Sequence, residues 1–211
     1  HNPNVELIEY DLENAAALLD EAGWVVDEDD GWRYKTIGAP EGEKVRFHFT
    51  MNLPQSFVDA RRMIDIYRDD LRRIGVSFDT LIEENAAREQ RMRNHELTAH
   101  VDTYQVFADP DVWRNYFHTD SIKNGRNYDG YSNSRVDELF DRSRLELDRE
   151  RRTEMLQELQ RLIQEDQPAL FLWNYSTTWA FSQRIRGVEL SPAGVVRFGP
   201  GARRWWVEKA R

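Results

Sequence analysis

The chain has 211 residues, of which 40% are hydrophobic and 12% aromatic, a composition that excludes disorder and supplies a sizeable core. Its 38 acidic residues exceed its 29 basic residues, and the resulting formal net charge of -9 would repel a phosphate backbone, so nucleic acid is not an expected partner. Cysteine is absent, which excludes disulfides, thiolate nucleophiles and thiolate metal ligands.

The chain carries no membrane-spanning or targeting pattern. No stretch approaches the roughly 20 consecutive apolar residues that cross a bilayer, and no basic start followed by an apolar run precedes the first helix. The first residue is His1 rather than methionine. We therefore expect a protein that does not span the membrane, and either a processed protein or a piece excised from a longer one.

The first predicted element is a helix over residues 11–22. Asp11 precedes a run rich in alanine and leucine, and Gly23 follows it directly. Aspartate is a preferred N-cap residue, and glycine is the commonest residue just past the end of a helix. The order of cap, apolar run and glycine therefore predicts where this helix begins and ends.

Two strands and a long helix are predicted next. Residues 45–51 alternate apolar and polar side chains, the period of a half-buried strand. Apolar residues at three- and four-residue spacing then predict an amphipathic helix from about Ser56 to Ile74, and a strand over 76–81 follows it. We expect this helix to pack on a sheet that contains both strands through one apolar stripe, which includes Met63, Ile64, Tyr67 and Leu71.

The alternation of strands and helices continues. Residues 84–93 are polar and predict a helix, and residues 97–107 predict another strand. Strand, helix and strand in this order are typical of βαβ units. The sequence therefore predicts the α/β class, with a mixed sheet and flanking helices.

Helical patterns dominate the region that follows. Ser134 and Asp137 form a capping-box pattern ahead of an apolar stripe, and Asp148 caps a second helix that Pro168 ends. Residues 169–173 are continuously apolar, which is typical of a strand buried on both faces. The tail from about residue 191 has little to pack against locally, so we expect it to belong to a second lobe.

The motifs of most enzyme classes are absent. The sequence contains no glycine-rich phosphate loop, no Gly-x-Ser-x-Gly elbow and no His-Glu-x-x-His helix. The nearest pair of histidines, His95 and His100, is five residues apart at a helix-to-strand boundary, a spacing that favours surface histidines over a metal site. We expect no metal, no cofactor and no catalytic residue.

One turn offers two interpretations. Asp109 and Asp111 could act as the acid and base of a glycoside hydrolase, but the intervening Pro110 favours a turn with an aspartate near a helix N-terminus. Aromatic residues surround this turn, and most of them are expected in the core. The remainder could line a pocket for an organic ligand.

A series of short segments resembles one known family. Residues 11–24, DLENAAALLDEAGW, are similar to a segment of the large peptide-binding family of extracytoplasmic solute-binding proteins, which serve ATP-binding-cassette (ABC) importers. Further segments follow at the family's spacing. They are LRRIGV at 71–76, DPD at 109–111, GYSN at 130–133, VDEL at 136–139, DRERR at 148–152, QEDQP at 164–168 and RG at 186–187.

The resemblance implies a substrate-binding component of an ABC importer in the periplasm or another extracytoplasmic space, not an enzyme. Family members have two lobes that enclose the ligand, and only the C-terminal part of the family pattern matches. Residues 1–190 would then be most of the second ligand-binding lobe, and residues 191–211 a tail that crosses toward the other, absent lobe. The implied partners are permease subunits and a small organic solute, most simply a peptide-like one. The motif residues Asp137 and Gly187 are expected to be structural.

One position departs from the family pattern. In peptide-binding members an aspartate three positions before the Asp-Pro pair holds the ligand's terminal ammonium, and here that position is Val106. A valine cannot pair with a cation, so either another residue such as Asp102 takes this role or the ligand is not a free-amine peptide. The candidate ligand contacts, chosen by position, are Tyr104, Val106, Phe107, Trp113, Asn174 and Tyr175.

Two other functions compete with solute import. Some family members are receptors for peptide signals, so the chain could be an interaction module. A hydrolase that uses Asp109 and Asp111 is the other alternative, and it requires the two carboxylates to converge in a cleft.

Overall fold

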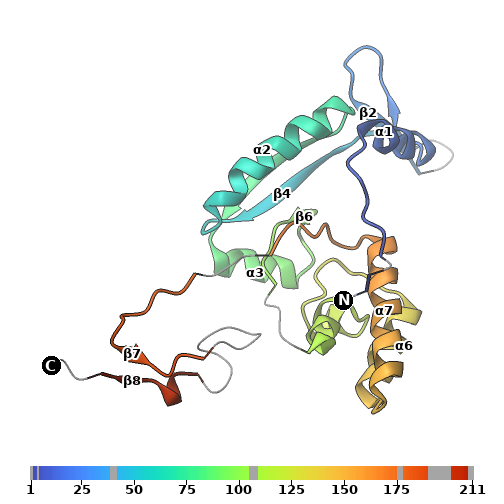
Figure 1. Cartoon of the computed structure of the whole chain (residues 1–211). Helices are drawn as coiled ribbons and strands as arrows, with labels where there is room; N and C mark the ends of the chain where they lie inside the picture. The colour runs from blue at the N-terminus through green and yellow to red at the C-terminus, as the bar shows by residue number, and fades with distance from the viewer. Residues whose placement is uncertain are drawn as a thin grey trace. The chain divides into compact units, whose positions relative to one another are not determined.

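The structure is a computed structural model that describes residues 2–3, 5–38, 42–104, 109–174, 178–189 and 201–208. The chain forms two compact units (Figure 1). One unit is residues Glu6–Tyr104, and the other combines His1–Val5 with Gln105–Arg211. The predicted α/β class is confirmed. The predicted boundary between residues 190 and 191 lies outside the described residues and stays a prediction.

The unit of residues 6–104 contains two small sheets and three helices. An antiparallel sheet has the order β1-β2-β3, and a parallel sheet has the order β5-β4-β6. The elements of this unit are α1 (Leu12–Glu21), β1 (Val25–Val26), β2 (Arg33–Ile37), β3 (Glu43–Arg46), β4 (His48–Pro54), α2 (Val58–Arg73), β5 (Ser77–Glu83), α3 (Asn85–Arg93) and β6 (Ala99–His100).

The helix predicted from its caps is confirmed as α1. The Asp11 carboxylate accepts a hydrogen bond of 2.9 Å from the Asn14 backbone N–H, and Gly23 has a φ of +82° just past the helix. The side chain satisfies one of the donors that the first turn leaves free, and glycine takes the left-handed conformation without a steric penalty. Local chemistry alone therefore places both ends of α1.

The single strand predicted over 45–51 is wrong in extent, because the chain changes sheet at Phe47. The Phe47 N–H donates to the Arg33 carbonyl, whereas the Phe47 carbonyl accepts from the Ser77 N–H. One residue thus pairs with both sheets. Strand β3 before it pairs with β2, and strand β4 after it pairs with β5 and β6. The alternating pattern runs through the break, so the pattern alone could not reveal it.

Helix α2 covers one face of the parallel sheet, as predicted. Ile64 is 2% exposed and belongs to a core cluster with residues of β4 and β5, and Val101 joins it from the end of β6. The rest of the predicted stripe, Met63, Tyr67 and Leu71, packs against this cluster. Val45 lies in the other sheet, so the predicted composition of the sheet is corrected at that residue.

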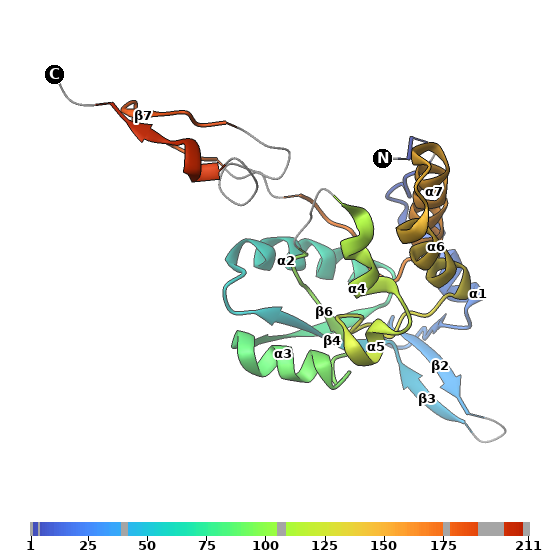
Figure 2. The ribbon, with the colours of Figure 1, turned by 90° about the horizontal axis from the view of Figure 1, so that it is seen from below.

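Helix α3 is confirmed, but the strand predicted over 97–107 is much shorter. Only Ala99 and His100 pair with β4, and the described residues 101–104 form no strand. The Val101 N–H still donates to the Asn52 carbonyl, after which β4 has only two residues left. Residues 105–108, with Val106 and Phe107 among them, lie outside the described part of the chain. Figure 2 shows α2 and α3 on opposite faces of this sheet.

The other unit is mainly helical. Helix α7 begins at the predicted cap, since the Asp148 carboxylate accepts from the Arg151 N–H at 2.9 Å. The elements of this unit are the 3-10 helix η1 (Pro110–Trp113), α4 (Arg114–Phe117), α5 (Ser121–Asn124), α6 (Ser134–Leu145), α7 (Arg149–Asp166), β7 (Ile185–Arg186), the 3-10 helix η2 (Gly201–Arg204) and β8 (Trp206–Val207).

The cap predicted for α6 is shifted by one residue. The side chain of Asn133, rather than that of Ser134, accepts from the backbone N–H groups of Arg135 and Val136. Asp137 does not complete a capping box, because its carboxylate accepts from the Thr119 N–H at 2.9 Å. Asparagine caps as well as serine, so both residues fitted the sequence pattern. The tertiary partner of Asp137 decided between them.

The buried strand predicted over 169–173 is wrong. These residues form no strand, and their large side chains are 44–63% exposed. A strand buried on both faces needs a partner strand for its backbone, and none of the described residues pairs with this run. Continuous apolar sequence therefore indicated burial that the described chain does not supply.

Strands β7 and β8 form a short antiparallel ribbon in which Gly187 is required. Its φ is +76°, and a Cβ atom there would lie 2.4 Å from the Arg204 carbonyl oxygen. No other residue fits this close backbone approach. The structural role expected for Gly187 is confirmed.

A matched pair of isoleucines on α2 tests the packing of this helix on the parallel sheet. The Ile64 side chain is 2% exposed. Ile64→Ala should therefore lower the free energy of unfolding by about 2–5 kcal/mol, because truncating this side chain leaves a cavity in the core. Ile66 is 62% exposed, so Ile66→Ala should change it by less than about 0.5 kcal/mol. Urea unfolding of both variants measures the difference, and equal losses would contradict the packing of α2.

Candidate functional site

The order of the parallel sheet creates a place where two connections diverge. The chain leaves β4 through α2 to reach β5 on one side, and leaves β5 through α3 to reach β6 on the other side of β4. Open α/β sheets bind ligands at such a switch point, outside the carboxyl ends of the strands. Here the switch point lies between the ends of β4 and β6, and Tyr104 follows β6 by four residues.

The face of this sheet under α3 is polar and buried. Asn52, in the central strand, is 1% exposed and its amide donates to the Glu83 carboxylate at the end of β5. The Arg91 guanidinium, from α3, lies 2.9 Å from both oxygens of that carboxylate. A half-buried carboxylate is favoured when charge and hydrogen bonds compensate for its lost hydration. Arg91 and Asn52 together meet this requirement.

A second arginine of α3 holds the chain where it leaves β6. Arg88 is 5% exposed, and its Nη2 atom donates to the Val101 carbonyl at 2.5 Å. Its Nη1 atom lies 3.8 Å from the Asp102 carboxylate, which also accepts from the Thr103 N–H at 2.8 Å. Asp102 itself is on the surface. The residues just before Tyr104 are therefore fixed by a buried cation.

The Asp109-Pro110-Asp111 turn has the structural role that the proline favoured. Asp109 is the N-cap of η1 and accepts from the Asp111 N–H at 2.9 Å. It also pairs with Arg152 of α7 at 2.9 Å, while Asp111 lies 3.3 Å from Arg144 of α6. The hydrogen bond from the Asp111 amide, followed by the bond and charge of Arg152, holds the pKa of Asp109 below its usual value.

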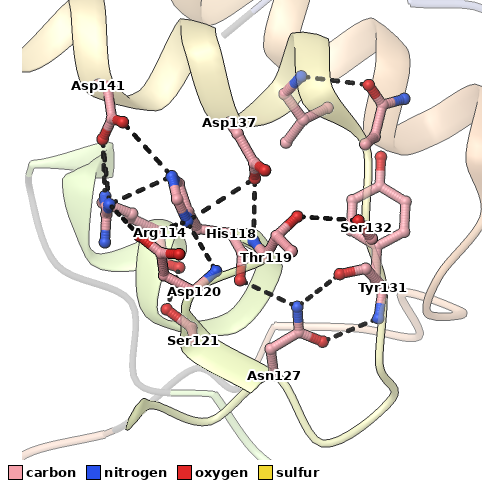
Figure 3. A network of polar contacts seen from close by, with 12 residues as sticks. Arg114, His118, Thr119, Asp120, Ser121, Asn127, Tyr131, Ser132, Asp137 and Asp141 are labelled. Carbon is pink, nitrogen blue, oxygen red and sulfur yellow. Dashed lines mark hydrogen bonds and ion pairs between the residues drawn. The ribbon is translucent and has the colours of Figure 1, made fainter. Parts of the chain in front are cut away.

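A polar network follows this turn in the sequence and joins α4 to α6 (Figure 3). His118 is 4% exposed, and its Nδ1 atom accepts from the Asp120 N–H at 3.0 Å. Its Nε2 atom lies 3.1 Å from Arg114 Nη2 and 3.6 Å from the carboxylate of Asp141. Burial would raise the pKa of Asp141, but the hydrogen bond and charge of Arg114 outweigh it, and the net shift is downward.

The loop between α5 and α6 is fixed from the same network. Asn127 is 1% exposed and bonds to the backbone carbonyls of His118 and Tyr131, and its oxygen accepts from the Tyr131 N–H at 3.0 Å (Figure 3). The Tyr131 hydroxyl donates to Asp166 at the end of α7. Burial, and then this bond to a carboxylate, raises the pKa of Tyr131. The network satisfies buried backbone groups and therefore stabilises the unit.

The predicted ligand contacts have different surroundings. Tyr104 is half-buried in the unit of residues 6–104. Trp113 is half-buried in the other unit, where its ring stacks on Phe117 at 5.8 Å and meets Phe171 edge-on at 6.3 Å. Asn174 is exposed in that same unit. The remaining predicted contacts, Val106, Phe107 and Tyr175, lie outside the described residues, so the set of six stays a prediction.

We call the side chains of Asn52, Glu83, Arg88 and Arg91 the polar frame of the switch point. The sequence patterns did not predict it. Arg88 and Arg91 stand three residues apart on a helix with little apolar surface, a pattern that normally indicates a solvated face. The one available signal was Asn52, a polar residue between Met51 and Leu53 in an apolar strand. A buried asparagine needs a partner from another element, and the sequence does not say which.

Among the described residues, Asp109 and Asp111 do not form the acid–base pair that a hydrolase would need. The carboxylates of Asp109 and Asp111 are each engaged by a different arginine rather than converging on a cleft. Over the described ranges, no group of three or more His, Cys, Asp or Glu side chains is placed to hold a metal ion. The same ranges contain no helix that is long and apolar enough to cross a membrane.

The sequence matches one protein family over most of its first two thirds. The family model is described as bacterial extracellular solute-binding proteins, family 5 middle, and the match covers residues 1–125. The chain is also 28% identical over 208 residues to the oligopeptide-binding protein AppA of Bacillus subtilis (strain 168). That alignment covers 98% of this chain and 36% of AppA, so the chain spans about a third of the length of this curated relative.

Solved structures of similar proteins share this fold. AppA from Bacillus subtilis, in complex with a nonapeptide, matches with a TM-score of 0.79 and 25% identity over 99% of this chain and 40% of AppA. The oligopeptide-binding protein from Thermus thermophilus, complexed with a pentapeptide, matches with a TM-score of 0.70 and 28% identity over 81% of this chain and 30% of that protein. NikZ from Campylobacter jejuni, in complex with Ni(L-His), shares the fold at 18% identity, with a TM-score of 0.75 over 97% of this chain and 41% of NikZ.

The charge of Asp109 should make a small, pH-dependent contribution to stability. Asp109→Asn keeps an oxygen that caps η1 but removes the charge that faces Arg152, and exposed ion pairs contribute at most about 1 kcal/mol. Because the folded pKa lies below the ordinary value of 3.8, the contribution is complete above that value and is lost as the pH falls through the folded pKa.

Urea unfolding of the wild type and Asp109→Asn between pH 7 and pH 3 measures this contribution. The difference in unfolding free energy should be constant from neutral pH to about pH 5 and should shrink below about pH 4. Asp109→Ala, which also removes the cap, should cost about 1 kcal/mol more. A difference that grows toward low pH would contradict the pairing of Asp109 with Arg152.

Proposed function

The chain belongs to the bacterial extracellular solute-binding proteins of family 5, and we propose that it supplies part of the ligand-binding wall of an ABC importer's substrate-binding component. The protein would bind a peptide-like or other small organic solute reversibly and deliver it to permease subunits. It would act in the periplasm or another extracytoplasmic space. Two relatives solved with bound peptides, AppA and the Thermus thermophilus protein, support the choice of ligand class.

The observation that carries this proposal is the frame at the switch point. The chain leaves β6 there with Asp102 and Thr103 on the surface, while the buried Arg88 holds the backbone beneath them. A surface that is fixed from below loses little conformational freedom when a ligand docks on it. Residues at the carboxyl end of such a sheet are also where α/β proteins bind small molecules.

The six predicted contacts, Tyr104, Val106, Phe107, Trp113, Asn174 and Tyr175, are part of this proposal. Tyr104 continues the fixed segment after Thr103, which makes it the contact that the frame supports most directly. Trp113 packs on Phe117, so only part of its ring is available to a solute. An aromatic side chain that is held by neighbouring rings offers a rigid apolar surface at low entropic cost.

We further propose that residues 1–190 act as one lobe and that residues 191–211 cross to a second lobe of a longer protein. The alignment covers only 36% of AppA, which supports a longer protein of which this chain is one part. Closure of two lobes around the solute would exclude water and allow reversible capture. Each lobe would supply one wall of the cleft.

This division predicts that the chain alone binds solute weakly. A pocket that normally buries most of a ligand loses much of its contact when one wall is missing, and the missing contacts determine the affinity. Isothermal titration with a nine-residue peptide should give an affinity at least about tenfold lower for residues 1–211 than for the full-length gene product. Equal affinities would place the whole site within this chain and rule out the two-lobe proposal.

We also expect no turnover of the solute. Asp109 and Asp111 are engaged by Arg152 and Arg144, and the pKa of Asp109 is shifted downward, away from the raised value that a general acid needs near neutral pH. Incubation of the full-length gene product with peptides and with glycosides, followed by mass spectrometry, should recover intact substrate. Hydrolysis that disappears in both Asp109→Asn and Asp111→Asn would contradict the binding function and favour a hydrolase.

A further inference from the structure

The charged side chains at the switch point include two pairs of opposite charge, and Arg91 of one pair also lies 3.7 Å from the Glu96 carboxylate. Glu83 faces Arg91 at 2.9 Å, and Asp102 faces Arg88 at 3.8 Å. Both arginines come from α3, and both carboxylates stand at the carboxyl end of the sheet, on β5 and just past β6. Each cation therefore offsets the anion of a different strand end.

The two pairs differ in their access to a ligand. The side chain of Glu83 is 19% exposed, and its carboxylate accepts a hydrogen bond from the buried amide of Asn52. This carboxylate therefore points toward the protein interior rather than toward a ligand. The side chain of Asp102 is 32% exposed, and the next residue, Thr103, is also on the surface. Arg88, in contrast, is 7% exposed at its side chain and cannot itself reach a solute. Only the anion of this pair can meet a ligand.

We propose that Arg88 is a specificity-determining residue, because it offsets the charge of Asp102 and makes this wall indifferent to a positive charge on the solute. The inference rests on the proposed function, in which residues after β6 contact the ligand. A carboxylate without a nearby cation attracts a ligand ammonium, whereas a buried cation 3.8 Å away offsets much of that attraction. Arg88 acts through Asp102 and touches no ligand.

The composition of the neighbouring segment is consistent with this proposal. Residues 103–108 contain no acidic side chain, so Asp102 is the last carboxylate before Asp109. Asp109 pairs with Arg152 at 2.9 Å. The carboxylates that flank this segment in sequence are thus both offset by arginines.

The test is a pair of probes that differ by one unit of charge. A nine-residue peptide of alanine, serine and phenylalanine, amidated at its C-terminus, is prepared with a free and with an acetylated amino group. Isothermal titration of the full-length gene product gives the ratio of the two affinities. A ratio does not depend on the fraction of active protein, so it separates a change in charge selectivity from a loss of fold.

Opposite substitutions should move this ratio in opposite directions. For the wild type, the two peptides should bind within about twofold of each other. Arg88→Met leaves Asp102 without this cation and should favour the free amine by about fivefold, whereas Asp102→Asn removes the carboxylate and should shift the ratio toward the acetylated peptide. The double variant should restore the wild-type ratio, and salt at about 0.5 M should weaken both shifts.

Arg93→Met is the matched control, because Arg93 lies on the same helix with its side chain 50% exposed and pairs with Glu89 one turn away. It should leave the ratio unchanged. Should Arg88→Met fail to fold, Asp102→Asn still tests the proposal, since its carboxylate is on the surface. Unchanged ratios in both variants, or a wild-type preference for the free amine above about tenfold, would overturn the role of Arg88. Failure of the wild type to bind either peptide would instead overturn the proposed function, and this inference with it.

Discussion

The parallel pairing of β4 with a neighbour on each side is the constraint on which the unit of residues 6–104 depends. It makes β4 the central strand and divides its side chains between two buried faces. Met51 and Leu53 face α2 and form an apolar core, whereas Asn52 faces α3 and must find polar partners. Helix α3 contributes little apolar surface, so arginines that reach buried acceptors hold it in place. The polar contacts between Asn52, Glu83 and Arg91 are therefore a consequence of one polar residue in a central strand.

Sequence patterns predicted those elements whose ends are determined locally. The caps at Asp11 and Asp148 and the single stripe of α2 needed no knowledge of the rest of the fold. The patterns failed where a distant partner decides. Phe47 ends one strand and begins another because Arg33 and Ser77 bind its two backbone groups, and neither partner is visible in the local sequence. Residues 169–173 failed for the converse reason, since a strand-like run without a partner does not become a strand.

The candidate site was predictable only in outline. The proline in the Asp109 turn correctly favoured a cap over a catalytic pair, and the aromatic residues near it include a packed cluster at Trp113 and Phe117. Arg88 could not be singled out, because an arginine in a polar helix looks the same whether it is buried or solvated. Its role depends on the carbonyl of Val101, which the fold delivers from another strand. The sequence indicated the chemistry of individual side chains, but it did not indicate which charged residues from different elements pair with each other.

In each unit, an arginine from a helix holds an aspartate that flanks residues 103–108, the segment that joins the two units in sequence. At its start, Arg88 anchors Val101 and Asp102, and at its end Arg152 anchors Asp109, which also caps η1. Each anchor is an arginine from a helix that lies elsewhere in the sequence, so each unit fixes its own end of the segment independently. Fixing the residues on either side of 105–108 reduces the conformational freedom that these flanking residues would lose when a ligand docks beside them. Under the proposed function, relatives could then change ligand by substitution within this short segment, as Val106 already departs from the family pattern, without rebuilding either fold.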